Sequence, residues 1–170
     1  MILDLCDKND PILRQPIPKF DFVNLPTDPI QLAKDLAETM LHNNGIGLAA
    51  NQVGLPYRCF VIKSNPIICC FNPIVVDTSS EQALLEEGCL AFPGVYIKVK
   101  RPTIIKVRYT EPNTNIVTKK FIGMTSRIFQ YELAHLNGEI FQNNISDTKL
   151  LMAIKRAKKL GYNYTLGDFK

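Results

Sequence analysis

The segment with the clearest chemical content is Gln130-Tyr131-Glu132-Leu133-Ala134-His135. It is similar to the His-Glu-x-x-His pattern, in which two histidines four residues apart share a helix face and bind one metal ion. The glutamate of that pattern handles protons for the water molecule that the metal activates. Glu132 and His135 keep their positions, but Tyr131 stands where the first histidine is expected. The case for a metal enzyme therefore depends on Tyr131.

Two other segments combine glycine with polar side chains, Gly45–Gln52 and Glu87–Leu90. A Gly-x-Gly run is a weak signal alone, because glycines often serve only a turn or close packing. No Lys-Ser/Thr pair follows the first segment, which argues against a nucleotide-phosphate loop. Cys89 in the second segment has polar neighbours. The other four cysteines lie among apolar residues and are predicted to be buried, reduced thiols: Cys6, Cys59, Cys69 and Cys70.

The elements that must position these segments follow from periodicity and turn residues. Residues 1–27 contain four prolines and are predicted to form an irregular arm. A helix is predicted from a cap at Thr27 or Asp28, with Pro29 in its first turn, to about Asn43. Segments rich in β-branched and aromatic residues predict strands at 57–62, 67–76, 95–99, 103–109 and 115–121.

Two further helices are predicted in the C-terminal half. In Met124–Leu136, one face carries Ile128, Tyr131, Glu132 and His135. The other helix, at 147–160, is basic. Its inward residues are predicted to be Leu150, Leu151, Ile154 and Ala157, and its solvent-facing cations are Lys149, Lys155, Arg156, Lys158 and Lys159.

Length and composition predict one globular domain over residues 1–170. The net charge of +4 is too small to indicate nucleic-acid binding over the whole surface. No run of about 18 apolar residues occurs. The N-terminus also lacks a basic stretch followed by an apolar one. We therefore expect a cytoplasmic location, no membrane association and a monomer.

Taken together, the three segments resemble the peptide deformylase family. That family carries Gly-x-Gly-Leu-Ala-Ala-x-Gln, Glu-Gly-Cys-Leu-Ser and Gln-His-Glu-x-Asp-His in this order. Gly45–Gln52 matches the first motif completely, and Glu87–Leu90 matches the second up to Ala91, which replaces Ser. The third motif is changed at Tyr131 and Ala134. The resemblance implies an α+β fold, with mixed, mostly antiparallel sheets around the helix that bears Glu132 and His135.

The resemblance also implies roles for individual residues. Cys89 and His135 would bind one divalent metal ion, for which iron, zinc and nickel all suit such ligands. Glu132 would act first as general base and then as general acid. The Gln52 side-chain amide and the Leu90 backbone N–H would stabilise the oxyanion.

Supporting positions carry over in the same way. Gly45, Ile46, Gly47 and Gly88 would line the substrate site. Arg101 would pair with Glu87 and with the helix aspartate, which is Ala134 in this chain. The implied reaction removes the N-formyl group from the initiator methionine of nascent peptides and releases formate.

Tyr131 leaves three interpretations open. Its ring packs into a metal-free pocket, its phenolate binds the metal, or the metal is held by Cys89, His135 and solvent alone. A phenolate ligand requires a pKa far below the usual value of about 10, which a nearby cation can supply. Glu132 likewise is either the general base or an ordinary solvated helix residue.

Two functions therefore compete. The first is an active, atypical metal-dependent deformylase. The second is a catalytically weak or inactive homologue that binds formyl-methionyl peptides or a ribosomal partner. A generic zinc protease fits poorly, because it does not account for Gly88-Cys89-Leu90. The basic helix at 147–160 is either an ordinary solvated face or a contact with ribosomal RNA.

Overall fold

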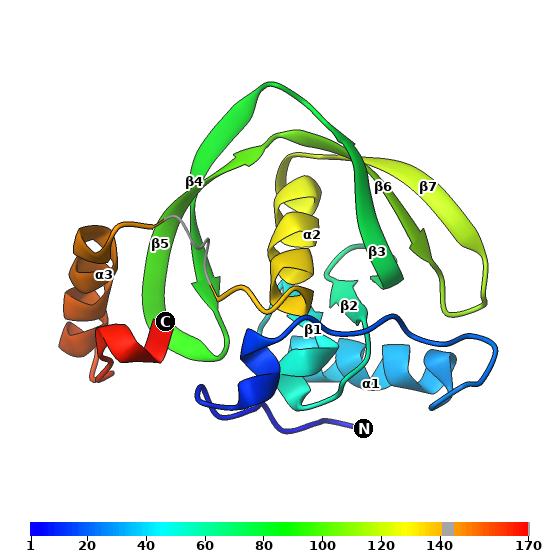
Figure 1. Cartoon of the computed structure of the whole chain (residues 1–170), viewed down its shortest axis with the longest axis horizontal. Coiled ribbons are helices and arrows are strands. Elements are labelled where there is room, and N and C mark those ends of the chain that lie inside the picture. The colour runs from blue at the N-terminus through cyan, green and yellow to red at the C-terminus, as the bar shows by residue number, and fades with distance from the viewer. Residues whose placement is uncertain (141–144, 170) are drawn as a thin grey trace.

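The computed structural model describes residues 1–140 and 145–169. A five-stranded sheet in the order β1-β2-β3-β6-β7 and a two-stranded sheet β4-β5 stand on either side of helix α2 (Figure 1). The strands are β1 (Gly47–Ala49), β2 (Cys59–Ile62), β3 (Ile68–Thr78), β4 (Gln82–Cys89), β5 (Phe92–Pro102), β6 (Ile104–Thr110) and β7 (Ile116–Ile122). The helices are α1 (Pro29–His42), α2 (Gly123–Leu136) and α3 (Asp147–Lys159), with short 3₁₀ turns at Pro11–Arg14, Ala50–Val53 and Leu166–Phe169.

The predicted α+β class with α2 at its centre is confirmed. Every strand pairing among the described residues is antiparallel, so no parallel pair makes the sheets mixed there. Two strands were not predicted. β1 has only three residues, and β4 contains Glu86, Glu87 and Gly88, which lack strand propensity. β4 forms because it pairs with β5 along its whole length, a long-range interaction that local propensity does not report.

Helix α1 begins as the sequence predicts. The Asp28 carboxylate accepts a hydrogen bond from the Ile30 N–H at 2.9 Å, and Pro29 occupies the first turn. Leu36 and Met40, one turn apart, are fully buried. This apolar stripe packs α1 against β1 and β2 and so supports the segment Gly45–Gln52 from outside.

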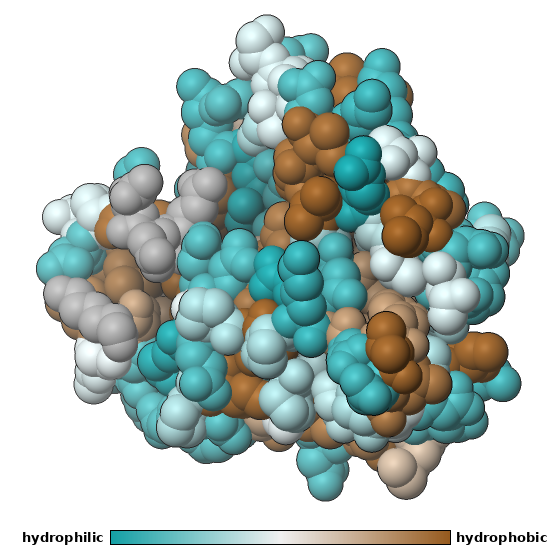
Figure 2. All heavy atoms as spheres, turned by 45° about the vertical axis from the view of Figure 1, so that its right-hand side comes forward, coloured by the Kyte–Doolittle hydropathy of each residue, from teal (hydrophilic) through white to brown (hydrophobic). Residues whose placement is uncertain are grey.

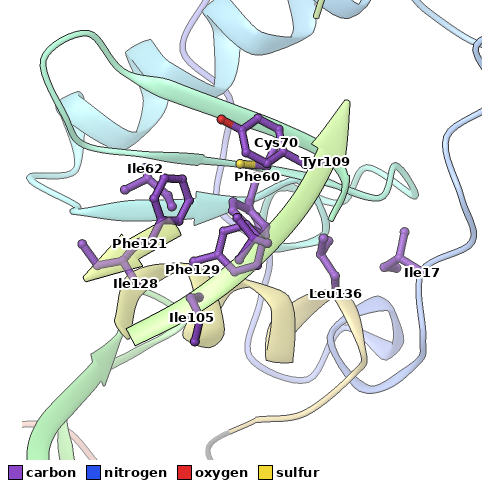
Figure 3. Packing of buried hydrophobic residues seen from close by; sticks show 12 residues of the cluster. Ile17, Phe60, Ile62, Cys70, Ile105, Tyr109, Phe121, Ile128, Phe129 and Leu136 are labelled. Carbon is purple, nitrogen blue, oxygen red and sulfur yellow. The ribbon is translucent and has the colours of Figure 1, made fainter. Parts of the chain in front are cut away.

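The core beneath α2 is aromatic. The Phe129 ring meets the rings of Phe60 and Phe121 edge-on, at centroid distances of 5.1 and 5.7 Å (Figure 3). Such edge-to-face pairs add about 0.5–1.5 kcal/mol beyond the apolar area they bury. Phe129 and Leu136 are both fully buried. This packing fixes α2 on the five-stranded sheet and leaves its opposite face toward β4-β5.

The N-terminal arm is irregular, as predicted, apart from the 3₁₀ turn Pro11–Arg14. It nevertheless contributes to the core, because Leu13, Ile17 and Phe20 are buried. The Ile17 N–H also donates to the Leu136 carbonyl at 2.8 Å. The arm therefore covers the C-terminal end of α2.

Helix α3 packs against β5 through Leu150, Ala153 and Ala157, which are buried. The prediction that Leu151 packs inward is wrong, since it is 49% exposed. Its position follows Leu150 by about 100° around the helix, which turns it away from β5. Beyond α3 the chain returns to the start of β5, where the Tyr164 hydroxyl donates to the Pro93 carbonyl at 2.9 Å.

Several large apolar side chains are exposed on the sheet, including Ile74, Ile116 and Ile122. On the face that Figure 2 shows, apolar surface occurs in separate patches divided by hydrophilic residues. Among the described helices, none combines the length and the apolar character that crossing a bilayer requires.

Gly47 allows α2 to approach β1 closely. A Cβ atom at this position would overlap the Glu132 carboxylate and lie 2.8 Å from Ile128 Cγ2. We expect Gly47→Ala to lower the free energy of unfolding by about 1–3 kcal/mol, because the interior must shift to admit a methyl group. Urea denaturation measures this change. Gly167→Ala is the control, since its nearest neighbour would lie at an ordinary 3.5 Å, and equal effects of the two changes would contradict the prediction.

Candidate active site

The three segments singled out in the sequence meet at one cavity of about 550 Å³. Its wall includes Gly45, Ile46, Gly47 and Gln52 from the first segment, and Glu87, Gly88, Cys89 and Leu90 from the second. Tyr131 and Glu132 of α2 form a further part of the wall. Two of the predicted site residues, His135 and Arg101, do not line the cavity. They contact residues that do line it, Cys89 and Glu87 respectively.

The end of a β-hairpin positions Cys89. It is the last residue of β4, pairs with Phe92 at the start of β5, and follows a register shift at Gly88. Its side chain is buried, with 7% exposure for the residue, so its polar neighbours in sequence do not place it at the surface. All five cysteines are free, which agrees with the predicted reduced thiols. Cys6 and Cys69 are only partly buried, contrary to the prediction for them.

Cys89 and His135 form a close pair, with 3.5 Å between Sγ and Nε2. Two ligands on one tetrahedral zinc ion, at about 2.3 Å for sulfur and 2.1 Å for nitrogen, would stand about 3.6 Å apart. Burial raises the pKa of Cys89 to about 11, opposed by the Tyr131 hydroxyl and by the Ala91 and Phe92 amides. Burial and then the Arg101 charge lower the pKa of His135 to about 4. Its imidazole is therefore neutral near pH 7, the form that binds metals.

Tyr131 lies beside this pair. Its ring meets the His135 ring edge-on, with centroids 4.7 Å apart. Its hydroxyl is buried and acts on the Cys89 thiol, but it makes no hydrogen bond of normal geometry within the described parts of the chain. Burial, followed by the Cys89 charge, raises the pKa of Tyr131 well above its usual value, so the phenol stays protonated in the site as it stands.

A metal ion fits part of this arrangement. The Cys89–His135 spacing suits two ligands, and two buried atoms of residues in the cavity wall lack hydrogen-bond partners: Tyr131 Oη and Glu132 Oε2. Buried polar atoms normally have partners, so these atoms favour a polar or charged group in the site. Across residues 1–140 and 145–169, however, no three His, Cys, Asp or Glu side chains form a metal-binding cluster. Tyr131 is the nearest candidate for the third position.

Glu132 is 2% exposed and faces the cavity. Burial, and then the Glu87 charge, raise its pKa to about 8. A carboxyl group whose pKa lies near neutral pH can both accept and return a proton. The interpretation of Glu132 as a solvated helix residue is therefore wrong.

Gln52 is oriented by its neighbours. Its Oε1 accepts a hydrogen bond from the Ala49 N–H at 2.8 Å, which directs its Nε2 toward Cys89 Sγ at 3.7 Å. The adjacent Asn51 donates from Nδ2 to the His135 carbonyl at 2.7 Å. The first segment is thus joined directly to the end of α2, and it presents an amide donor beside the thiol.

Glu87 is held by two guanidinium groups. Arg101 donates to both carboxylate oxygens at 2.5 and 2.8 Å, and Arg127 donates to Oε1 at 2.7 Å. The pairing with Arg101 follows the resemblance, but Arg127 was not predicted. Its position one turn before Tyr131 on α2 was the available signal, because residues i and i+4 share a face. A charged residue at that position is normally assigned to solvent, yet Arg127 is 6% exposed.

Apolar and aromatic side chains surround the cavity mouth. Tyr96 packs over Gly88, where an added Cβ would come within 2.7 Å of the ring. Ile46 and Met124 are 53% and 56% exposed, and Tyr162, from the chain after α3, completes this rim. The site therefore combines a polar interior with an apolar entrance.

Comparison with known proteins shows the family of the chain. The model of the polypeptide deformylase family matches residues 2–150. Peptide deformylase 1 of Nostoc sp. is 37% identical over 168 residues, covering 95% of this chain and 88% of the relative. The peptide deformylase of Thermotoga neapolitana is 37% identical over 151 residues, covering 86% of this chain and 89% of the relative.

Solved structures agree with the sequence relatives. A peptide deformylase from Synechococcus elongatus, crystallised in complex with actinonin, superposes with a TM-score of 0.87 at 30% identity, covering 99% of this chain and 90% of that one. A peptide deformylase from Thermotoga maritima gives a TM-score of 0.75 at 34% identity, covering 86% of this chain and 99% of that one. With the motifs, the fold and the cavity in place, the chain belongs to the peptide deformylase family.

Proposed function

We propose that this deformylase removes the N-formyl group from N-formylmethionyl peptides and releases formate. The observation that carries the proposal is the convergence of Gln52, Glu132 and the Cys89–His135 pair on one cavity wall or directly behind it. These are an amide donor, a carboxyl group with a pKa near neutral and a pair of ligand atoms, which amide hydrolysis requires.

We propose that Cys89 and His135 hold one divalent cation, Fe²⁺, Zn²⁺ or Ni²⁺, with the Tyr131 hydroxyl as the third protein ligand. Support comes from the 3.5 Å spacing of the pair and from the buried, unpartnered Tyr131 hydroxyl. When bound, such a cation supplies Lewis-acid activation of water and polarises the formyl carbonyl. The ion also favours the ionised forms of the thiol and phenol, against the effect of burial.

The chain's own residues account for the remaining chemistry. Glu132 takes a proton from the attacking water and returns one to the departing amine. The Gln52 amide and the Leu90 backbone N–H donate to the oxyanion at the formyl carbon, where each donor contributes about 3–4 kcal/mol. Gly45, Ile46, Gly47 and Gly88 border the bound peptide, and the apolar rim receives its first side chain.

Tyr131 also supports a second function. A neutral phenol is a poor metal ligand, and a site with two protein ligands is weaker than one with three. The chain would then be a catalytically weak homologue that binds formyl-methionyl peptides or a ribosomal partner. Metal content and turnover separate this function from the first.

We further propose that the protein is a cytoplasmic monomer that docks on ribosomal RNA through α3. The exposed cations of α3 support the docking: Lys149, Lys155, Arg156, Lys158 and Lys159. All five are exposed, although Arg156 also forms an ion pair with Glu86 at 3.8 Å, so a partner can reach them without unfolding the helix.

Formate release from a formyl-Met tripeptide tests the main proposal. With protein loaded anaerobically with Fe²⁺, we expect turnover that Glu132→Ala reduces by about 100-fold or more, because a positioned general base contributes that much. Equal rates for wild type and Glu132→Ala would reject deformylation at this site and leave the binding function.

Tyr131→His tests the metal site separately. We expect the metal content, measured by elemental analysis after dialysis, to rise toward about one ion per chain, because imidazole binds as a neutral ligand. Tyr131→Phe is the matched control, since it keeps the ring and removes the ligand atom. A metal content in Tyr131→His that stays well below one ion per chain would show that more than one ligand has been lost.

Ribosome docking predicts a salt-dependent affinity. Each cation of α3 that contacts a phosphate contributes up to about 0.9 to the slope of log K against log salt. We expect the double variant Lys155→Ala/Lys159→Ala to lower that slope in a cosedimentation assay with ribosomes. Lys106→Ala/Lys120→Ala removes two exposed cations from β6-β7 instead. An equal decrease of the slope in both double variants would indicate only a general effect of net charge and would contradict docking through α3.

A further inference from the structure

Arg127 is a buried cation at the interface between α2 and the β4-β5 hairpin. It belongs to the cavity wall, and its side chain is 7% exposed. A charged group at such depth needs partners, because removing a charge from water is unfavourable unless it is compensated. Its partners therefore indicate what it holds together.

All three partners of Arg127 lie on the hairpin. Nη1 donates to Glu87 Oε1 at 2.7 Å and to the Val99 carbonyl at 3.1 Å, and Nη2 donates to the Ala83 carbonyl at 2.6 Å. Glu87 and Ala83 belong to β4, and Val99 belongs to β5. One helix side chain thus bonds to both strands of the hairpin.

Arg101 cannot make this connection. It lies on β5, so its ion pair with Glu87 on β4 stays within the hairpin. Apart from the Cys89–His135 pair itself, the other hydrogen bonds from α2 to the hairpin in the described parts of the chain come from Ser126 and Gln130 and reach the Pro102 carbonyl. Pro102 pairs with Gln82, at the opposite end of the hairpin from Cys89. Among the described residues, Arg127 therefore makes the charged link between α2 and the middle of the hairpin.

This link joins the two elements that carry the proposed ligands. Cys89 is two residues beyond Glu87 on β4, and His135 is two turns beyond Arg127 on α2. We propose that Arg127 is a positioning residue: by tying Glu87 to α2, it sets the distance between the Cys89 thiol and the His135 imidazole. The inference rests on the proposed function only in treating this pair as a cation site.

Cobalt binding reports the thiol–imidazole geometry directly. Co²⁺ is titrated into metal-free protein, and the cobalt–thiolate absorption gives both affinity and coordination. We expect Arg127→Met to weaken Co²⁺ binding by about 10- to 100-fold and to alter the band, as loss of supporting contacts around a metal site does. Arg127→Lys keeps the charge with fewer hydrogen-bond donors, so its Co²⁺ affinity should lie between those of wild type and Arg127→Met. Lys100→Met removes an exposed cation from β5 and should leave the Co²⁺ affinity and the cobalt–thiolate band unchanged.

A second-site change separates positioning from a simple loss of stability. Position 134 lies seven residues after Arg127, on the same helix face. Arg101 and Arg127 both contact Glu87 Oε1, so an acid two turns beyond Arg127 on the same helix face is offered Arg101 as a partner across the same interface. We expect Ala134→Asp to restore at least tenfold of the lost Co²⁺ affinity in Arg127→Met and to change wild type by less than about twofold.

Wild type, Arg127→Met, Ala134→Asp and the double variant are then compared without metal by urea denaturation. A restored link raises the urea midpoint more in Arg127→Met than in wild type, and this coupling is the sign of a shared interaction. Equal midpoint shifts in both backgrounds would overturn the inference, as would unchanged Co²⁺ affinity in folded Arg127→Met. If wild type binds no Co²⁺, the series is repeated with Tyr131→His. Failure of every variant to bind rejects the cation site, while the urea cycle still decides the role of Arg127.

Discussion

The site depends on the Glu87 carboxylate, which two buried guanidinium groups share. Arg101 holds it within the β4-β5 hairpin, and Arg127 holds it from α2. Removing one partner from a buried charge network leaves another charge without compensation, at a cost of about 3–5 kcal/mol. The network therefore keeps the strand that ends at Cys89 and the helix that carries His135 in one fixed relation.

Burial determines the protonation states of the groups in the site. The same exclusion of water raises the pKa of Glu132 to about 8 and of Cys89 to about 11, and it lowers the pKa of His135 to about 4. Neutral forms of these three groups are favoured, because burial disfavours the charged form of each. A cation entering the site would favour the thiolate, while the imidazole is already in its binding form.

Tyr131 distinguishes this chain from the motif of its family. A histidine there would offer a neutral nitrogen ligand, whereas the phenol must lose a proton that burial and Cys89 help it keep. Ala91 and Ala134 also differ from the family motifs, but Gln52 is oriented by its neighbours and Glu132 faces the cavity. Under the proposed function, the residues proposed to bind the peptide are therefore combined with an altered metal-binding motif, and activity depends on how far the phenol can act as a ligand.

The sequence by itself determined the three motifs, the helix face that carries Glu132 and His135, and the start of α1 at Asp28. These depend on spacing along the chain and on local hydrogen bonds. Tertiary structure alone decided the burial of Cys89, the pairing of β4, the exposure of Leu151 and the buried ion pair of Arg127 with Glu87. Each of these results from contacts between residues far apart in sequence, which change a residue's solvent exposure without changing its local pattern.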